Sequence, residues 1–240
     1  MNKHDKTPLH IALVMDGNGR WAASQGRERA FGHASGTESV RACIRAALST
    51  GVRYLTLYAF STENWERPRE EVEGLMDLLC DSIAKESPEL ARQGVRVMVI
   101  GARAGLSERV RRHIEAIESE TAGGKNLTVV LAVNYSARSE LVRAASLIAA
   151  DAIAGGLSPV MITEAALAEK LYTAEIPDPD MIVRTGGEQR LSNFLLWQAA
   201  YSELYFTPVM WPDFGEEEFR GAVEEYGRRE RRFGKLTNSY

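Results

Sequence analysis

The sequence IALVMDGNGRW, residues Ile11–Trp21, joins a short apolar run to a glycine-rich polar turn. The apolar part does not alternate with polar residues, which is typical of a strand buried on both faces. The turn places an acid, two glycines and an arginine where that strand ends. Open α/β sheets bind ligands at this position, and a glycine-rich turn that opens a helix suits a phosphate. Because Asp16 could hold Mg²⁺ against such a phosphate, the stretch predicts phosphate and metal chemistry on an α/β fold.

The remainder of the chain alternates short apolar runs with long amphipathic segments. The predicted strands are His10–Met15, Tyr54–Phe60, Val95–Ile100, Leu127–Asn134, Met181–Val183 and Leu204–Phe206. The predicted helices are Gly36–Ser49, Arg69–Gln93, Ser107–Thr121, Ser136–Ala154, Ile162–Leu171 and a last one from Glu216 to Arg229. This alternation predicts a mainly parallel central sheet of about six strands, flanked by helices on both faces.

We interpret residues 1–240 as a single domain. The chain is long enough for one large α/β core, and 45% of its residues are hydrophobic. Gly155-Gly156 and Pro177-Asp178-Pro179 mark breaks, but no change of composition flanks either of them. We expect the tails at 1–8 and 235–240 to be flexible.

Composition also limits the function classes. The net charge of −4 argues against a general nucleic-acid-binding protein. We expect no transmembrane segment, since no apolar run approaches the ~18 residues that a spanning helix needs. Met1–Lys6 is polar and Leu9–Met15 is too short for a signal peptide. Cys43 and Cys80 lack metal-ligand spacing, so we interpret them as buried free thiols in a reducing, cytoplasmic compartment.

Polar clusters follow three of the predicted strands. They are Asp16–Trp21 with Arg27, Arg29 and His33, then Ser61–Arg67, and then Arg184–Ser192. The carboxyl ends of parallel strands meet at one edge of a sheet, so the clusters should converge there. Each combines arginine with small or hydroxyl residues, the donors that diphosphate oxygens require. Three such clusters suggest a site for two anionic groups.

Residue types alone leave several roles open. Asp16 could be a helix cap as well as a metal ligand, and His33 could simply pack. Asn64 cannot be a strong base, although it could orient a group or pass a proton within a network. Glu203 interrupts an apolar segment and could be either a paired buried carboxylate or a second metal ligand.

Two longer segments also have two interpretations. The apolar stripe within Arg69–Gln93 is typical of core packing, and the alternative is one wall of an apolar channel. The basic run Arg228–Gly234 is typical of a solvated helix end, with anion binding as the alternative.

The motifs taken together resemble the cis-prenyltransferase family, most of all its bacterial undecaprenyl diphosphate synthases. The resemblance runs from His10 to Gly234 and is carried by Met15–Trp21, Ala59–Arg67, Ile182–Phe206 and Trp211–Phe214. It implies a dimeric α/β fold with a hydrophobic tunnel beside the sheet. It also implies Mg²⁺-dependent elongation of an allylic diphosphate, commonly farnesyl diphosphate, by isopentenyl diphosphate in Z geometry. The expected product is undecaprenyl diphosphate, a carrier-lipid precursor for cell-wall synthesis that passes to the membrane from a cytoplasmic, at most loosely membrane-associated enzyme.

The resemblance assigns roles to individual residues. It makes Asp16 a Mg²⁺ ligand essential to catalysis, Asn64 the proton acceptor and Glu203 a second metal ligand. It surrounds the allylic diphosphate with Gly17, Asn18, Gly19, Arg20, Trp21, Arg29 and His33. It assigns further substrate contacts to Ser61, Thr62, Glu63, Trp65, Arg67, Arg184, Arg190, Leu191 and Ser192, with Arg184, Arg190 and Ser192 on the isopentenyl diphosphate. Arg232-Phe233-Gly234 resembles an element that reaches the partner subunit's site.

The chain departs from the family pattern at two places. Ser136-Ala137 stands where many members have Gly-Gly, so the local turn could differ, and Gln189 replaces a histidine of some relatives. Product length is open, since positions around Cys80–Ile83 and Leu127–Leu131 could stop elongation early or late. A shorter-chain Z-prenyl diphosphate synthase is the close alternative. A non-catalytic partner subunit is disfavoured because Asp16 and Asn64 are both present, and a nucleotide-binding module because no Walker-type motif is.

Overall fold

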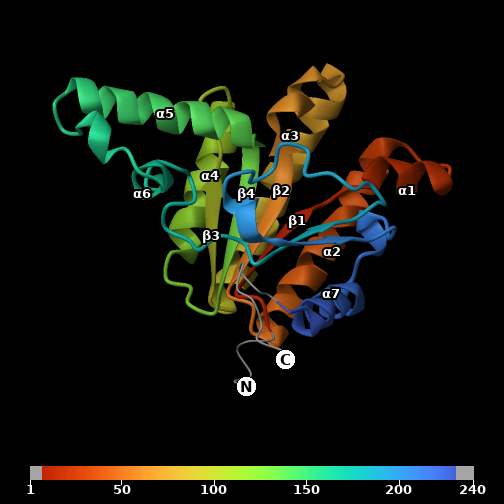
Figure 1. The fold of residues 1–240 in the computed structure, drawn as a ribbon. Helices are drawn as coiled ribbons and strands as arrows, with labels where there is room; N and C mark the ends of the chain where they lie inside the picture. Colours follow the sequence, from red (N-terminus) through yellow and green to blue (C-terminus); the bar gives the residue numbers. More distant parts are fainter. Residues whose placement is uncertain (1–6, 231–240) are drawn as a thin grey trace, which may run out of the picture.

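A computed structural model describes residues 7–230, which form one six-stranded parallel sheet (Figure 1). The strands are β1 His10–Val14, β2 Tyr54–Ser61, β3 Val95–Ile100, β4 Leu127–Tyr135, β5 Met181–Arg184 and β6 Glu203–Phe206. The predicted α/β fold is confirmed, with each strand ending within a residue of its predicted bounds. Apart from Thr7 and Pro8, the tails expected at 1–8 and 235–240 lie outside the described residues, and so does Arg232-Phe233-Gly234.

The strand order β3-β4-β2-β1-β5-β6 places β1 at the point where the connections change direction. In the register of the sheet, Leu13 of β1 lies opposite Leu57 of β2 on one side and Val183 of β5 on the other. The residues that follow these three strands therefore leave the same edge of the sheet. Such a switch point is the usual ligand position in open α/β sheets.

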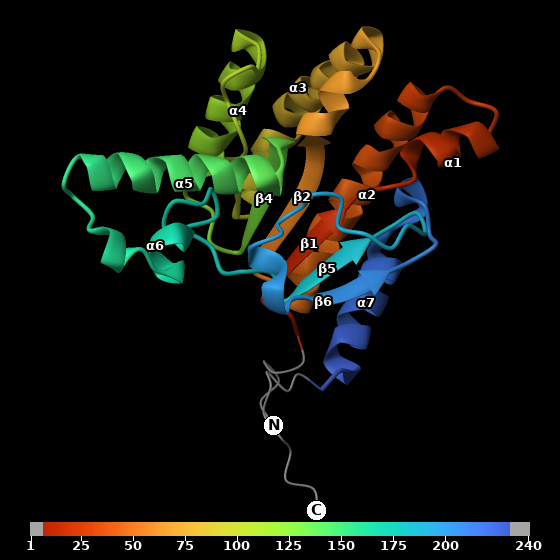
Figure 2. The ribbon, with the colours of Figure 1, turned by 45° about the horizontal axis from the view of Figure 1, so that its top comes forward.

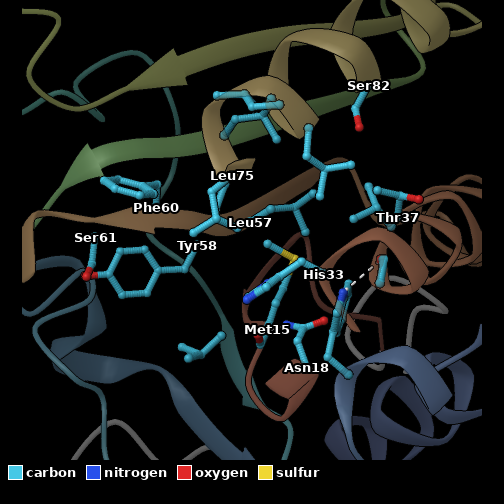
Figure 3. Close-up of a pocket in the computed structure, with 18 of the residues that line it drawn as sticks. Met15, Asn18, His33, Thr37, Leu57, Tyr58, Phe60, Ser61, Leu75 and Ser82 are labelled. Carbon is cyan, nitrogen blue, oxygen red and sulfur yellow. Dashed lines mark hydrogen bonds between the residues drawn. The ribbon is translucent and has the colours of Figure 1, made fainter. Parts of the chain in front are cut away.

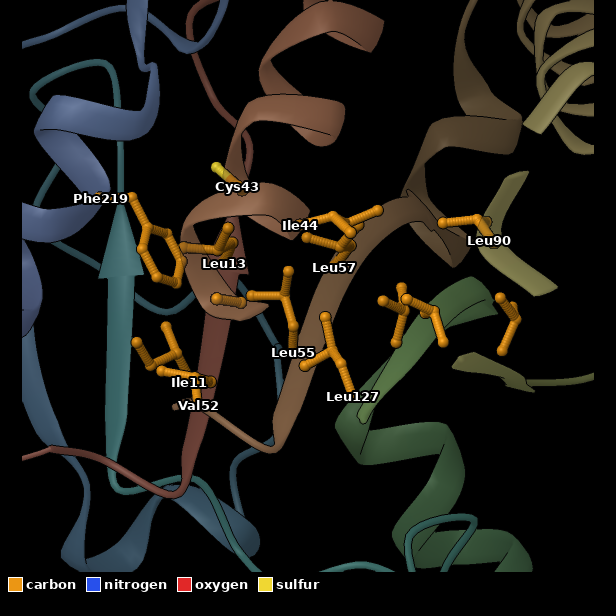
Figure 4. Close-up of a cluster of buried hydrophobic side chains, with 14 of the residues drawn as sticks. Ile11, Leu13, Cys43, Ile44, Val52, Leu55, Leu57, Leu90, Leu127 and Phe219 are labelled. Atoms are coloured by element: carbon orange, nitrogen blue, oxygen red, sulfur yellow. The ribbon is translucent and has the colours of Figure 1, made fainter. Parts of the chain in front are cut away.

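Helices cover both faces of the sheet. They are α1 Asn18–Ser24, α2 Arg29–Thr50, α3 Arg69–Arg92, α4 Glu108–Thr121, α5 Ala137–Ile153, α6 Glu164–Ala168 and α7 Glu216–Arg228. The larger core joins α2, α3, α4 and α7 to one face, where Leu13, Leu57 and Phe219 are buried together (Figure 4). The smaller core lies on the other face around Phe194 and the start of α5, and α5 and α6 lie together, away from α2 and α7 (Figure 2).

Two helices differ from the prediction. Helix α2 begins at Arg29 rather than Gly36, so that Arg29 and His33 lie in its first two turns. The helix continues through Gly32. A Cβ at this position would lie 2.1 Å from the Asn18 carbonyl oxygen, so glycine here allows α1 and α2 to approach each other. Helix α6 is limited to Glu164–Ala168, shorter than the predicted Ile162–Leu171, since a 3-10 turn at Pro159–Met161 precedes it.

The turn after β4 does not depend on glycine. Asn134 adopts the left-handed conformation, with φ of 49°, whereas Ser136 is extended, with φ of −150°, and Ala137 begins α5. Serine and alanine are therefore compatible with the backbone at the two positions where relatives carry Gly-Gly.

Both cysteines are buried as free thiols, as expected, and burial raises the pKa of each. Cys43 packs within the larger core (Figure 4). None of the helices within residues 7–230 combines the length and apolar composition needed to cross a membrane.

Candidate active site

A cavity of about 1320 Å³ lies between the sheet and helices α2 and α3. Its walls are mostly apolar and come from both helices, from α4 and from β2, β3 and β4: Val40, Ile44, Leu57, Leu75, Met76, Leu79, Ile83, Leu90, Val97, Ile117, Val129 and Leu131. Its polar end lies at the carboxyl ends of the strands, where His33 and Asn18 lie together and Ser61 lies beside Tyr58 (Figure 3). The stripe on α3 is thus partly core and partly cavity wall.

Asp16 follows β1 at the polar end and is paired with two arginines. Its Oδ2 accepts a hydrogen bond of 2.9 Å from Arg184 Nη2, and its Oδ1 lies 3.2 Å from Arg20 Nη2. Partial burial alone would raise the pKa of this carboxyl, but the hydrogen bonds and charges of Arg184 and Arg20 outweigh it and lower the pKa. Gly17, with φ of 110°, occupies the N-cap position of α1. Asp16 is therefore an ionised carboxylate on the cavity wall, and Gly17, not Asp16, is the N-cap of α1.

Arg184 organises the third cluster from within the protein. Its side chain is 5% exposed, and its Nη1 donates to the Arg190 carbonyl oxygen at 2.6 Å and to Ser192 Oγ at 2.7 Å. Its buried Nε has no hydrogen-bond partner among residues 7–230. The Arg184 guanidinium thus connects Asp16 to the loop that carries Arg190 and Ser192. Its Nε–H remains available to donate a further hydrogen bond.

The first and third clusters also meet through their backbones. Thr185 Oγ1 donates to the Asp16 carbonyl oxygen at 2.7 Å and accepts from the Asp16 amide at 3.0 Å. Gly186 has φ of 80°, and a Cβ on it would lie 2.8 Å from Arg20 Nη2. Glycine at position 186 is therefore favoured by its positive φ and by the Asp16 carbonyl oxygen, which would lie 2.9 Å from a Cβ there. Arg190 reaches Glu188 at 2.5 Å and remains largely exposed.

The second cluster forms a 3-10 turn, Thr62–Glu66, directly after β2. Asn64 Oδ1 accepts from the Ser61 amide at 3.0 Å, so that the carboxamide is held in place at the cavity. Trp65 Nε1 donates to Asn134 Oδ1 at 2.7 Å, which ties this turn to the end of β4.

Two arginines and His33, from the first and second clusters, converge on Glu71. Arg67 Nη1, Arg29 Nε and His33 Nε2 lie 2.9, 3.5 and 3.9 Å from Glu71 Oε1. Burial of His33 lowers its pKa most, Arg67 and Arg29 lower it further, and Glu71 acts in the opposite direction. His33 is therefore neutral at neutral pH and can accept or donate a hydrogen bond at the polar end.

Glu203 is not part of this site. It begins β6 opposite Met181, which lies opposite Ile11 at the amino end of β1, and Arg229 Nη1 donates to it at 2.9 Å. The strand between Ile11 and Asp16 places these two backbone positions about 16 Å apart. Within one chain Glu203 therefore lies near the opposite end of the strands from Asp16, and its role as a second metal ligand stays a prediction.

Most residues assigned by resemblance, Trp21 among them, lie around the polar end of the cavity, which we call its mouth. Trp21 stacks on Phe31 and donates through Nε1 to Asp213 at 2.7 Å, outside the cavity wall. Direct cavity-wall positions among the predicted residues belong to Asp16, Asn18, His33, Ser61, Glu63, Asn64, Arg67, Arg184, Arg190, Leu191 and Ser192. Gly17, Gly19, Thr62 and Trp65 border them in sequence, whereas Arg20, Trp21, Arg29 and Glu203 do not.

Arg138 and Asn193 are among the cavity residues that were not predicted. Arg138 follows β4 and its exposed side chain faces the cavity, whereas Asn193 follows Ser192 with φ of 61°. Arg138 could have been found, because it stands after its strand as the other arginines stand after theirs. Nothing in the sequence marks Asn193, because its contacts come from segments far apart in the chain.

The donor set fits one kind of metal. Within residues 7–230 no group of three or more histidine, cysteine or acidic side chains comes together. Mg²⁺ is commonly bound by one or two carboxylates together with substrate phosphates and water, rather than by a full protein cage. Asp16 at a cation-rich mouth can supply that single carboxylate.

Comparisons with known proteins agree with this geometry. A family model described as "Putative undecaprenyl diphosphate synthase" matches residues 14–234. The chain is 52% identical over 230 residues to an isoprenyl transferase from Agrobacterium fabrum, covering 96% of this chain and 93% of that protein. It is 46% identical over 233 residues to an isoprenyl transferase from Thermotoga maritima, covering 97% and 99% of the two chains.

Solved structures share the fold. Lavandulyl diphosphate synthase from Lavandula x intermedia, in complex with dimethylallyl diphosphate, has a TM-score of 0.93 and 37% identity, covering 95% of this chain and 99% of that one. A probable undecaprenyl diphosphate synthase from Campylobacter jejuni has a TM-score of 0.80 and 33% identity, covering 98% of this chain and 100% of that one.

Proposed function

Because the chain belongs to the undecaprenyl diphosphate synthase family of prenyltransferases, we propose that it condenses isopentenyl diphosphate with an allylic diphosphate in Z geometry. The proposed starter is farnesyl diphosphate and the proposed product is undecaprenyl diphosphate. The observation that carries this proposal is one cavity with two chemically different parts. A cationic mouth built around Arg184 suits diphosphates, and an apolar interior suits a hydrocarbon chain.

At the mouth, the residues would bind and orient the two diphosphates. Arg20 and His33 lie on the first-cluster side, whereas Arg184, Arg190 and Ser192 lie on the other. Mg²⁺, when bound, would neutralise negative charge on the allylic diphosphate and help it to leave, and Asp16 would hold the ion. The arginines would stabilise charge that develops on the departing oxygen. Asn64, fixed by the Ser61 amide, would orient and pass on the proton lost after the double bond attacks, with the released diphosphate as its final acceptor.

The interior would shield the allylic cation and accept the growing chain. From His33 to Ile44 the cavity follows α2 for about 16 Å. Leu57, Leu75 and Leu79 face it from the sheet and from α3. An apolar wall offers no nucleophile to the cation and excludes water from it.

Product sizing tests this function. Purified protein incubated with farnesyl diphosphate, isopentenyl diphosphate and Mg²⁺ is expected to give undecaprenyl diphosphate, measured by chromatography and mass spectrometry. Products shorter than undecaprenyl would contradict the product assignment and leave a shorter-chain synthase. No condensation product with farnesyl or dimethylallyl diphosphate would contradict the proposed reaction.

A shorter-chain product is the second candidate, and one observation favours it. The structure with the TM-score of 0.93 is a lavandulyl diphosphate synthase bound to dimethylallyl diphosphate. Product sizing with dimethylallyl diphosphate as the starter, together with isopentenyl diphosphate, separates the candidates, because a shorter-chain synthase would stop before undecaprenyl diphosphate.

Val129→Phe is expected to shorten the products. Val129 lines the cavity near the amino end of β4, about 20 Å along the strand from the polar mouth. A phenyl ring there would fill space that the chain tip needs. Val129 is 2% exposed and belongs to the larger core, so the ring must displace neighbouring side chains as it enters the cavity, and overpacking of this kind costs roughly 1–3 kcal/mol. Unchanged product length in a folded variant would show that the chain does not reach Val129.

We further propose a homodimer that works in the cytoplasm and passes its product to the membrane. The resemblance of Arg232-Phe233-Gly234 to a partner-reaching element supports the dimer. The apolar product supports the transfer, since a long prenyl chain is stable only in an apolar environment.

A further inference from the structure

Ser192 and Asn193 form a strained pair at the junction of the site. Both have positive φ, 50° and 61°, although neither is glycine. Such conformations cost free energy and persist only where surrounding contacts determine them. The contacts of this dipeptide reach four separate segments of the chain.

Asn193 caps α5 from a distant loop. Its carbonyl oxygen accepts from the Ala137 amide at 2.8 Å, and its Oδ1 accepts from the Arg138 amide at 2.9 Å. Amides in the first turn of a helix have no partner within the helix. Ser136 occupies the N-cap position, but its hydroxyl binds Ser139 and does not cap the helix. Asn193 therefore performs the capping that the local residue does not.

The other end of the same side chain reaches the second cluster. Asn193 Nδ2 donates to Glu63 Oε1 at 2.9 Å, and Glu63 immediately precedes Asn64. The neighbouring Ser192 Oγ accepts from Arg184 in the third cluster. The dipeptide therefore contacts both the second and the third clusters. The Tyr58 hydroxyl adds a longer contact of 3.4 Å to the Ser192 carbonyl oxygen.

We propose that Asn193 is a positioning residue that fixes the Arg184–Ser192 side of the mouth relative to Asn64. This inference rests on the proposed function, which places isopentenyl diphosphate on the Arg184–Ser192 side and the proton transfer at Asn64. The carboxamide suits this role, since its oxygen accepts from the Arg138 amide and its NH2 group donates to the Glu63 carboxylate. Correct orientation of two bound reactants accounts for a large part of a condensation rate, so a small displacement would lower kcat.

A donor–acceptor exchange tests the proposal. In Asn193→Asp the acceptor for the Arg138 amide remains, but a carboxylate faces Glu63, and kcat is expected to fall by about 10- to 100-fold, equivalent to roughly 1.4–2.7 kcal/mol. In Glu63→Gln the amide oxygen can still accept from Asn193, so the fall should be less than about threefold. In the double variant the glutamine amide can donate to the introduced carboxylate, which restores the bond with its direction reversed. The kcat should then recover at least about fivefold over Asn193→Asp.

The KM for the allylic diphosphate should change less than about twofold in all three variants, because Asn193 acts on orientation and not on charge at the first cluster. A double variant no better than Asn193→Asp would overturn the proposal. So would Asn193→Ala with the wild-type kcat. Asn126→Asp is the matched control, since Asn126 is exposed and its side chain donates only to the Gln93 carbonyl oxygen, remote from the mouth.

Hydrogen exchange provides a readout that does not need turnover. The Arg138 amide should exchange faster in Asn193→Ala and stay protected in Asn193→Asp, which keeps the acceptor. If the wild type made no product, the proposed function would fail while this measurement still tested the contact. Equal protection of Arg138 in Asn193→Ala and wild type would overturn the capping role of Asn193.

Discussion

Asp16→Asn is expected to lower kcat by roughly 10²–10³-fold, the loss typical of removing one preorganised electrostatic group. The asparagine has the same shape, and its carbonyl oxygen can still accept from Arg184, so the mouth should keep its geometry. What is lost is the charge that would hold Mg²⁺ beside the diphosphate. The measurement is steady-state condensation over a range of Mg²⁺ concentrations, in which the variant should require more metal for half-maximal rate.

Asp77→Asn is the matched control, because Asp77 lies on the outer surface of α3 and pairs with Arg109. It should keep the wild-type rate and metal requirement. Wild-type turnover in Asp16→Asn would show that the carboxylate neither binds the metal nor takes part in catalysis.

The same substitution should change how stability depends on pH. Arg184 and Arg20 lower the pKa of Asp16 in the folded protein below its ordinary value of 3.8. A lowered folded-state pKa contributes stability above the unfolded pKa, and this contribution is lost as the pH falls through the folded pKa. The melting-temperature difference between wild type and Asp16→Asn should therefore be largest near neutrality and shrink below about pH 4. A difference that is constant from neutral to acidic pH would contradict the ion pairs.

Most of the sheet was predictable because its signal is local. The unbroken apolar runs indicated all six strands, and the cation clusters behind β1, β2 and β5 pointed to one edge. The first turns of α2 were missed because polar residues and Gly32 hide them. Only the approach of Asn18 explains that glycine, and this approach is a tertiary contact.

The prediction that Glu203 is a second metal ligand did not take its place on the strand into account. Glu203 precedes the apolar run Leu204–Phe206, so its place at the amino end of a parallel strand could be read from the sequence. The same strand-end reasoning that supports Asp16 therefore argues against Glu203 as its partner in one chain. The role of Asn193, by contrast, could not be predicted from the sequence. It depends on Glu63 and Arg138, which only the folded chain brings together.

Arg184→Lys is expected to raise the KM for isopentenyl diphosphate by about 10- to 100-fold, because losing one charge-assisted hydrogen bond costs roughly 1.5–3 kcal/mol. Arg184 donates in two directions, to Asp16 through Nη2 and to Ser192 and the Arg190 carbonyl through Nη1. A lysine ammonium is a single point on a flexible stem and cannot bridge both sides. Arg184→Met should lose more, since it also removes the charge that faces Asp16.

The comparison of the two variants separates charge from geometry. If charge alone mattered, Arg184→Lys would keep the wild-type KM, and that result would contradict the bridging role. If geometry matters, both variants lose activity, and Arg184→Lys keeps only the part due to charge.

Arg220→Lys is the control, because Arg220 pairs with Glu216 on the exposed face of α7 and should tolerate lysine without a kinetic change. Because the guanidinium is 5% exposed, melting temperatures must accompany the kinetics, and a KM effect in a variant that melts like wild type assigns the loss to the mouth.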